Sequence, residues 1–419
     1  FYTADSLIKS GNDVEIDIID RLPTPFGLIR GGVAPDHQTT KKVAKAYEKT
    51  ALNDSVSYFG NVEVGKDISI DELRKAYDAV VLAVGAPTDR KLGIPGDDKK
   101  GVYGSADFVG WYNGHPDFTN LNPDLDVKAV AVIGVGNVAI DTARVLVKTS
   151  NEMATTDIAD HATQAINASP IADVFLFGRR GPVEAKFTNV ELREMGKLEN
   201  CVPIIHEDQI PEEVLGSWSE RDQRLKERNL TTMREFLQVD TKGKSKNVHF
   251  KFFANPVEVL GNDRVEGLRV EKTMVKDGRA MGTGEFFEIE CGLIVAAIGY
   301  YSIPIEGVPF DNDNGIVKHT DGRIDEGVYA VGWIKRGPTG VIGTNKPDGD
   351  IAAKQIIADI KESKKPGRIE LISMLKERNV RVVNYQDWQK IDAAEITAAN
   401  EQAPRKKFVT IKEMISALD

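Results

Sequence analysis

The sequence predicts an α/β fold with two dinucleotide-binding units, and three features of the chain carry this prediction. The first is residues 129–146, AVAVIGVGNVAIDTARVL, where an apolar run, a Gly-x-Gly turn and a helical pattern follow one another. The second is a strand-like run over residues 14–19 that ends in Asp20, and the third is a glycine-rich stretch from Gly327 that precedes a helical pattern. Strands that alternate with helices in this order indicate parallel sheets that bind nucleotides at the carboxyl ends of their strands.

Length, charge and cysteine content exclude several classes of protein. The 419 residues are enough for two or more domains, and the net charge of −10 argues against nucleic acid as the main partner. The sequence has 2 cysteines, Cys201 and Cys291, and their separation excludes a C-x-x-C redox pair or a metal site built from cysteines. No apolar run approaches the roughly 18 residues of a membrane span. We expect a cytoplasmic protein with no metal and no integral membrane segment.

The first residues have the pattern of a nucleotide-binding unit that is already under way. Residues 1–10 have a helical pattern that ends at Gly11, and residues 14–19 are an apolar strand. Since such a unit has a central strand and a Gly-rich turn before its first helix, we expect the natural protein to continue upstream, where a targeting segment would not be readable. Asp20 stands where this fold places a ribose-binding carboxylate, although an Asp at a strand end is often a simple turn residue.

A long loop and several short elements follow. The loop, PTPFGLIRGGVAPDH over residues 23–37, is rich in Gly and Pro, and loops of this length tend to be functional. Its last residue, His37, is a candidate for catalysis, with a structural role as the alternative. The later patterns predict a helix over residues 39–52, a strand within 56–64, a helix over 70–76, a buried strand over 79–84 and a crossover over 101–116.

The glycine turn of the middle unit predicts a phosphate-binding site. Gly134 permits a sharp turn, and Gly136 lets the backbone approach a pyrophosphate. Ala139 takes the position where a small side chain allows close packing of helix and strand. The helix that starts here directs free N–H groups and the positive end of its dipole toward the phosphate.

The residues after the next strand indicate which nucleotide binds. That strand, residues 172–177, is followed by Gly178, Arg179 and Arg180, whereas NAD binding would place an acidic residue at its end. Arginine pairs bidentately with phosphate groups. We therefore favour NADP over the alternative of a solvated arginine pair.

The remaining patterns complete the order of elements. A polar, helix-prone insert covers residues 149–169, and the helix predicted over residues 220–236 carries Arg221, Arg224 and Arg228 as either a solvated face or a docking site. Other patterns predict a helix over 188–198, antiparallel strands over 248–253, 265–272 and 285–289, a buried strand over 292–298 and a long helix over 350–360.

Four long stretches, PFGLIRGGVAPDH, GVGNVAIDTAR, GRRGPVEAKFTNVELRE and VGWIKRGPTGVIGTN, resemble the adrenodoxin reductase family, whose bacterial members are NADPH–ferredoxin reductases. The likeness runs from Phe1 to about Met414. It implies two Rossmann-like domains of the glutathione-reductase type, with an NADP-binding domain over residues 105–304 inserted into an FAD-binding domain over residues 1–104 and 305–419. The family begins with a strand and a Gly-x-Gly-x-x-Gly turn for FAD, which this sequence does not contain, so we expect either that the natural protein supplies them upstream or that this form is defective in FAD binding.

The resemblance also implies a role for individual residues. Asp20 is expected at the FAD ribose, and the residues expected to line the flavin are Leu28, Val64, Trp333, Gly340, Val341 and Ile342. NADP is expected to meet Val135, Gly136, Asn137 and Val138 with its pyrophosphate, Arg179 and Arg180 with its 2′-phosphate, and Glu191 and Gly340 with its nicotinamide half. The candidates for the hydride-transfer site are His37, Asp141, Glu191 and Glu194.

The implied activity is that of an FAD-dependent NADPH:ferredoxin oxidoreductase, located in the cytoplasm or, in a eukaryote, in the mitochondrial matrix. A hydride would pass from NADPH to the flavin, which would release single electrons to a ferredoxin or a similar iron–sulfur protein, so the work of the protein is mainly positioning. Among the rival classes, a disulfide reductase lacks its C-x-x-C here. A flavoprotein similar to the small subunit of glutamate synthase and a non-catalytic NADP-binding sensor remain as alternatives.

Overall fold

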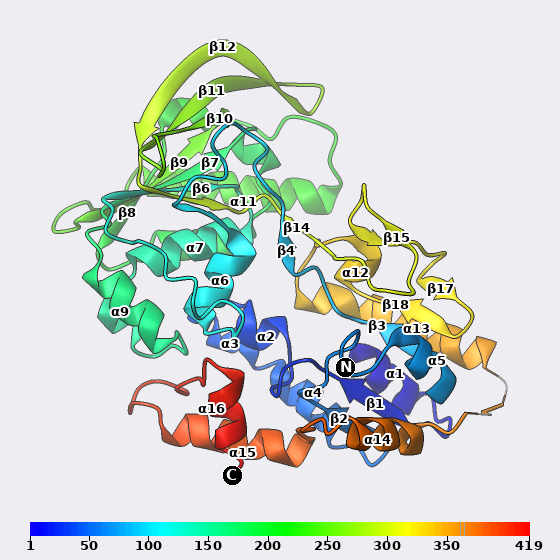
Figure 1. Ribbon diagram of the computed structural model, residues 1–419. Coiled ribbons are helices and arrows are strands. Elements are labelled where there is room, and N and C mark those ends of the chain that lie inside the picture. Colours follow the sequence, from blue (N-terminus) through cyan, green and yellow to red (C-terminus); the bar gives the residue numbers. More distant parts are fainter. Residues whose placement is uncertain (361, 364) are drawn as a thin grey trace.

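The computed structural model describes residues 1–360, 362–363 and 365–419 (Figure 1). Within these ranges the middle of the chain forms a six-stranded sheet in which every neighbouring pair is parallel. Its strands, in spatial order, are β5 (Val102–Gly104), β13 (Leu293–Ala296), β6 (Ala129–Ile133), β7 (Asp173–Gly178), β9 (Lys246–Phe252) and β8 (Cys201–Ile204). The predicted strand–turn–helix of residues 129–146 lies at the centre of this sheet, as a dinucleotide-binding unit requires.

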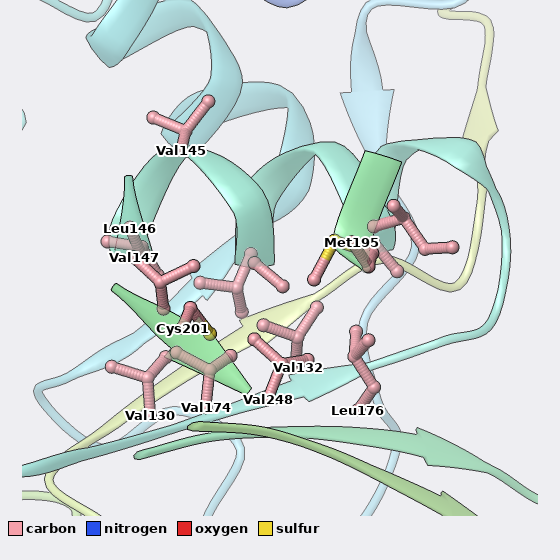
Figure 2. Close-up of a cluster of buried hydrophobic side chains, with 14 of the residues drawn as sticks. Val130, Val132, Val145, Leu146, Val147, Val174, Leu176, Met195, Cys201 and Val248 are labelled. Carbon is pink, nitrogen blue, oxygen red and sulfur yellow. The ribbon is translucent and has the colours of Figure 1, made fainter. Parts of the chain in front are cut away.

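Helices cover this sheet, and the central one follows the glycine turn directly. Figure 2 shows Val147 of α7 (Asn137–Val147) on the side toward Val130 of β6 and Val174 of β7, whereas Val145 lies on the opposite side of the helix; all four belong to one core of buried side chains. The other helices of this part are α6 (Ser105–Asn113), α8 (Ser150–Met153), α9 (Asp160–Ala168), η1 (Pro182–Glu184), α10 (Asn189–Met195), η2 (Glu207–Gln209) and α11 (Glu220–Phe236). None of the helices in the described ranges is long and apolar enough to cross a bilayer.

A second, antiparallel sheet extends from the end of β9. It consists of β10 (Ala254–Leu260), β11 (Gly267–Lys276) and β12 (Arg279–Glu290), and it confirms the antiparallel strands predicted over residues 265–272 and 285–289. The prediction that residues 248–253 are antiparallel is wrong, because β9 pairs in parallel with both β7 and β8. Its alternating pattern reflects one strand face that is less completely buried than the other, and burial of one face does not fix strand direction.

The first and last parts of the chain fold together. Their sheets are β1 (Ile16–Ile19) with β2 (Val56–Phe59), and β3 (Val80–Leu82) with β18 (Val328–Ala330) and β17 (Arg323–Asp325); a small ribbon joins β15 (Phe310–Asp311) to β16 (Ile316–Val317). The helices are α1 (Tyr2–Lys9), α2 (Leu28–Gly31), α3 (Gln38–Lys41), α4 (Ala44–Ala51), α5 (Ile70–Ala76), α12 (Trp333–Arg336), η3 (Ile342–Asn345), α13 (Lys346–Asp359), α14 (Arg368–Glu377), α15 (Tyr385–Thr397) and α16 (Ile411–Ser416). The single helix predicted over residues 39–52 is therefore two helices, which are separated at Lys42 and Val43.

Parallel pairing of β18 with β3 shows that the end of the chain returns to the unit formed by its beginning. Two hydrophobic clusters each contain residues from both small sheets: Ile16 and Tyr329 lie in one, and Ile19 and Leu82 lie in the other. The first and last parts of the chain therefore share their sheets and cores, and the division into an FAD-binding and an NADP-binding domain stays a prediction. The upstream strand expected before residue 1 stays a prediction.

The two parts are joined by an antiparallel ribbon of β4 (Thr88–Asp89) and β14 (Tyr300–Tyr301), which Figure 1 shows between them. Strand β5 follows β4 and already belongs to the six-stranded sheet. A division of the chain by sheets would thus assign residues 102–104 to the middle part, whereas the bounds predicted from sequence place them in the first part.

Candidate functional site

The turn before α7 has the geometry needed for a phosphate to approach the backbone. Gly134 has a φ of +139°, and an added Cβ would lie 2.3 Å from the carbonyl oxygen of Ala297, so a side chain does not fit there. A Cβ added to Gly136 would meet nothing within 4 Å, which leaves open space at the N-terminus of α7. The side chain of Asn137 accepts a hydrogen bond from the backbone N–H of Thr188 at 2.8 Å and so fixes the turn against α10. Residues Val135–Val138 could hold a pyrophosphate in this space.

Arg179 and Arg180 follow β7 and line a cavity of about 510 Å³. The loop that carries them is fixed by backbone contacts: the Arg179 carbonyl accepts a hydrogen bond from Thr273 Oγ1 at 2.8 Å, and the Arg180 carbonyl accepts one from Phe253 N at 3.1 Å. The cavity lies at the carboxyl end of β7, where a dinucleotide fold places the adenosine ribose. None of the four candidates for hydride transfer lines this cavity.

Those four candidates meet elsewhere, in an ionic cluster formed by Asp36, His37, Asp141, Arg144, Lys148, Glu191 and Glu194. Arg144 is its centre, with a side chain that is 0% exposed. Its guanidinium donates to both oxygens of Asp36, from Nε at 2.6 Å and from Nη2 at 3.0 Å, and Nη2 lies 2.9 Å from Asp141 Oδ1. Arg144 also lies 3.5 Å from a carboxylate oxygen of Glu191 and of Glu194.

His37 joins the loop after α2 to this cluster. Its Nε2 lies 3.0 Å from Glu191 Oε2, 3.2 Å from Glu194 Oε2 and 2.7 Å from Arg144 Nη2. The ring nitrogen donates to the carboxylates when it carries a proton and accepts from Arg144 when it does not. Whether His37 Nε2 carries a proton therefore depends on its three neighbours, Glu191, Glu194 and Arg144.

The pKa values of the cluster follow from burial and from these contacts. Burial lowers the pKa of His37, but hydrogen bonds to Glu191 and Glu194 raise it to about 10. Desolvation raises the pKa of Asp141 to about 7, against the lowering effect of the Arg144 charge. Burial would raise the pKa of Asp36, yet its hydrogen bonds with Arg144 hold that pKa well below its usual range. At neutral pH His37 is thus a cation, and Asp141 is the group that titrates.

The same side chains lie close enough to hold a metal, but their charge is already balanced. One ligand atom from each of His37, Asp141 and Glu191 lies within 4.8 Å of the others, and the same holds for Asp36, His37 and Glu194. The guanidinium of Arg144 contacts these carboxylates and supplies the positive charge that a metal would bring. We therefore assign no metal to the cluster.

Sequence reasoning missed Asp36, Arg144 and Lys148. A signal for Arg144 was present: it lies between Ala143 and Val145 on a helix whose surrounding residues are buried. A charged side chain in such a place is buried only when it is paired. The pattern predicts that a partner exists, but it cannot say which carboxylates supply it, because Asp36 is more than 100 residues away in the chain.

The first part of the chain has features that fit a flavin nucleotide. Desolvation raises the pKa of Asp20 to about 6, and one of its oxygens accepts a hydrogen bond from Leu22 N at 2.9 Å, so its other oxygen could accept a ribose hydroxyl. In the described part of the chain, Nε1 of Trp333 is buried and has no hydrogen-bond partner. A buried donor without a partner is costly, and an acceptor atom of a bound ring system would satisfy it.

The loops predicted to line the flavin present apolar side chains to the surface. Leu28 is 50% exposed and Val341 is 55% exposed, although both are large and apolar, and Val64 and Ile342 are partly exposed. Gly340 has a φ of +84°, and an added Cβ would lie 2.3 Å from Thr344 Oγ1, so the loop requires glycine at this position. These loops could bind a flat apolar ligand.

Comparisons with known proteins show that the chain is similar to NADPH-dependent reductases of iron–sulfur proteins. Residues 19–173 match the pyridine nucleotide-disulphide oxidoreductase family model. The chain is 40% identical to a mitochondrial NADPH:adrenodoxin oxidoreductase of Arabidopsis thaliana, over 100% of this chain and 92% of that protein. It is 38% identical to the NADPH-ferredoxin reductase FprA of Mycobacterium tuberculosis, over 99% of this chain and 96% of that one.

A solved structure agrees with the sequence relationships. The structure of Mycobacterium tuberculosis FprA in complex with NADPH matches with a TM-score of 0.93 at 37% identity, over 100% of this chain and 96% of that chain. The resemblance inferred from the four sequence stretches is confirmed by relatives that match over almost their whole length. This chain therefore belongs to the family of NADPH:adrenodoxin oxidoreductases and NADPH–ferredoxin reductases.

Proposed function

We propose that this chain is an FAD-dependent NADPH:ferredoxin oxidoreductase, which takes a hydride from NADPH and delivers single electrons to an iron–sulfur protein. The observation that carries the proposal is the match, over the whole chain, to the fold of a ferredoxin reductase solved with NADPH. The chemistry that bound FAD supplies is the conversion of a hydride into electrons that leave one at a time. The location, cytoplasm or mitochondrial matrix, stays a prediction.

For NADPH, the proposal assigns the pyrophosphate to residues 135–138 and the 2′-phosphate to Arg179 and Arg180. It is supported by the open space at Gly136 and by the cavity beside the two arginines. Glu191 and Gly340 would contact the nicotinamide half. The two guanidiniums would discriminate NADPH from NADH, because they have no counterpart to bind when the 2′-phosphate is absent.

For FAD, the proposal assigns the adenosine ribose to Asp20 and the ring system to Trp333 and the Gly340–Ile342 loop. The buried indole N–H of Trp333 would donate to the ring system, and Leu28 and Val64 would cover its apolar surface. These assignments account for an unpartnered donor and for exposed apolar side chains that are otherwise unfavourable.

The ionic cluster would position the two nucleotides relative to each other. Asp36 and His37 come from the part assigned to FAD, whereas Asp141, Arg144 and Glu191 come from the part assigned to NADP. Hydride transfer needs no separate proton, so the main task of these residues is to hold the parts at the distance that the transfer requires. His37 would keep its proton at Nε2, between Glu191 and Glu194.

The docking surface for the iron–sulfur partner is assigned to α11, and Arg193 of α10, which is close to the NADP site in sequence, is a further candidate. Arg221, Arg224 and Arg228 line a shallow cavity on α11, and the side chain of Arg224 is 72% exposed. The net charge of −10 provides no general attraction for an acidic ferredoxin. A local basic surface is therefore needed to steer the partner.

A disulfide reductase, which the name of the matching family model would also allow, is disfavoured by the cysteines. Cys201 and Cys291 are both free and buried, and burial raises the pKa of each thiol to about 12. Such thiols are poor nucleophiles. A glutamate-synthase-type flavoprotein and an NADP-binding sensor stay as alternatives for the experiment below.

The test is the absorbance spectrum of the purified protein, followed by its reduction. We expect a yellow protein whose flavin absorbance bleaches with NADPH far faster than with NADH, and which then reduces an added ferredoxin. A protein that binds NADP⁺ but has no NADPH-reducible absorbance would support the sensor. Oxidation of NADPH that depends on glutamine and 2-oxoglutarate, but not on ferredoxin, would support the glutamate-synthase alternative.

A further inference from the structure

A third arginine lines the cavity beside Arg179 and Arg180. It is Arg279, the first residue of β12, which follows the Asp277–Gly278 turn at the tip of the β11–β12 hairpin. The sequence places it about 100 residues after the arginine pair, and no motif connects them. The fold alone brings it to this site.

The hairpin is held over the arginine pair by specific contacts. The hydroxyl of Thr273 of β11 donates a hydrogen bond to the Arg179 carbonyl at 2.8 Å, and Arg180 Nη1 donates one to the Gly278 carbonyl at 3.3 Å. Strand β10 begins immediately after β9, whose neighbour in the sheet is β7. The tip of the hairpin therefore overhangs the carboxyl end of β7, and Figure 1 shows the antiparallel sheet next to these strands.

The charges around the cavity are not balanced within the protein. None of Arg179, Arg180 and Arg279 forms an ion pair with a carboxylate anywhere in the described ranges, in contrast to Arg269 of the same antiparallel sheet, which pairs with two glutamates. One acidic residue, Glu271, also lines the cavity, and its carboxylate accepts a hydrogen bond from Gly284 N at 3.1 Å. Three guanidiniums and one carboxylate leave two positive charges in excess.

This excess matches one kind of ligand. A phosphate monoester carries about −1.5 to −2 charges at neutral pH, whereas two arginines and Glu271 alone would leave a single positive charge in excess. Cations that converge without an ion-pair partner repel one another, so the arrangement is favourable when an anion lies between them. With Arg279, the excess positive charge of the cavity is therefore similar in size and opposite in sign to the charge of a phosphate monoester.

We propose that Arg279 is a specificity-determining residue, which completes the pocket for the 2′-phosphate of NADPH from the hairpin side. This inference rests on the proposed function, and it adds to the arginine pair a residue that lies on the antiparallel sheet. The hairpin contributes Glu271, Thr273 and Gly278 to the lining of the pocket besides Arg279. Discrimination between NADPH and NADH then depends on both the loop after β7 and the hairpin.

The test compares Arg279→Ala with Lys276→Ala in the full chain loaded with FAD. Lys276 is the cross-strand partner of Arg279 on the same hairpin, and it does not line the cavity. Because the two residues are neighbours, each substitution removes one positive charge at nearly the same position and changes the long-range electrostatic potential alike. A difference between the two variants therefore isolates direct contact with the ligand. The probe is adenosine 2′,5′-bisphosphate, with 5′-AMP as the ligand that lacks the 2′-phosphate, and binding is measured by calorimetry.

We expect Arg279→Ala to weaken binding of the bisphosphate about tenfold, as loss of one charge-assisted contact implies, and to leave binding of 5′-AMP unchanged. Lys276→Ala should change neither ligand by more than about twofold, and Arg279→Lys should recover part of the loss. Equal effects of the alanine variants, or an equal loss for both ligands, would overturn the inference. Loss of bisphosphate binding in Arg179→Leu with Arg180→Leu, but not in Arg279→Ala, would retain the proposed function and refute the role of Arg279.

Discussion

Replacement of Arg144 by Met tests how much the ionic cluster contributes to stability. The substitution removes the cation at the centre of the ionic cluster and keeps an apolar side chain of similar length. It leaves Asp36, which accepts two hydrogen bonds from Arg144, with Lys148 at 2.7 Å as its remaining cationic partner. Breaking a buried pair by removal of one partner costs about 3–5 kcal/mol, because the other charge stays buried. We expect a loss of that size in the free energy of unfolding.

The loss should depend on pH with a definite sign. The pKa of Asp141 in the folded protein is about 7, above its ordinary value, so the stability it contributes is present at low pH and is lost as pH rises through about 7. At pH 5 Asp141 is neutral in the folded protein and needs no cation, whereas at pH 8 it is ionised and requires Arg144. The Arg144→Met variant should therefore lose more stability at pH 8 than at pH 5.

Urea unfolding at both pH values, followed by circular dichroism, measures this effect. The matched control is Arg264→Met, which removes an ion pair with Asp124 at 2.7 Å whose arginine side chain is 50% exposed. An exposed pair of this kind contributes about 0–1 kcal/mol. If Arg144→Met were as stable as Arg264→Met at pH 8, or if its loss were larger at pH 5, Arg144 would not be the compensating charge of the cluster.

Three further predictions concern the nucleotides and the partner. Replacement of Arg179 and Arg180 by Leu should weaken NADPH binding by more than about 100-fold and leave NADH nearly unchanged, because each phosphate contact contributes about 1.5–3 kcal/mol; equal losses would show that the pair does not bind the 2′-phosphate. Glu191→Ala should slow flavin reduction in single-turnover mixing with NADPH or raise the concentration of NADPH that half-saturates it, and unchanged kinetics and affinity would remove Glu191 from the site. Reversal of Arg224 and Arg228 to Glu should slow electron transfer to an acidic ferredoxin at low salt while NADPH–ferricyanide reduction stays near normal; equal slowing of both reactions would mean that α11 is only structural.

Local sequence signals predicted the elements that depend on local chemistry. The turn at Gly134 and the helix after it follow from backbone geometry that few residues other than glycine can adopt, and both are present in the structure. Strand direction at residues 248–253 was predicted wrongly, because alternation reports burial of one face and the parallel neighbours lie far away in the chain. The contacts of Arg144 and the position of Arg279 could not be predicted for the same reason, because both depend on which distant segments the fold brings together.

Two ionic clusters link the beginning of the chain to the rest. One is the cluster around Arg144. In the other, Asp157 accepts hydrogen bonds from Lys41 at 2.6 and 2.8 Å and pairs with Lys407 at 3.2 Å, while Glu395 of α15 pairs with Arg30 of α2. Figure 1 shows α15 and α16 beneath the blue N-terminal helices, where the tail can reach both parts.

Buried ion pairs differ from hydrophobic contacts in what they require of their surroundings. An apolar surface tolerates small displacements, whereas a buried charge that loses its partner is left at a cost of several kcal/mol. The residues predicted to hold the two nucleotides lie on different parts of the chain, and both ionic clusters join those parts directly. Misplacement of reacting groups by 1 Å can cost about 100-fold in rate. Contacts that allow little displacement are therefore the kind that a hydride-transferring protein needs between its two nucleotide-binding parts.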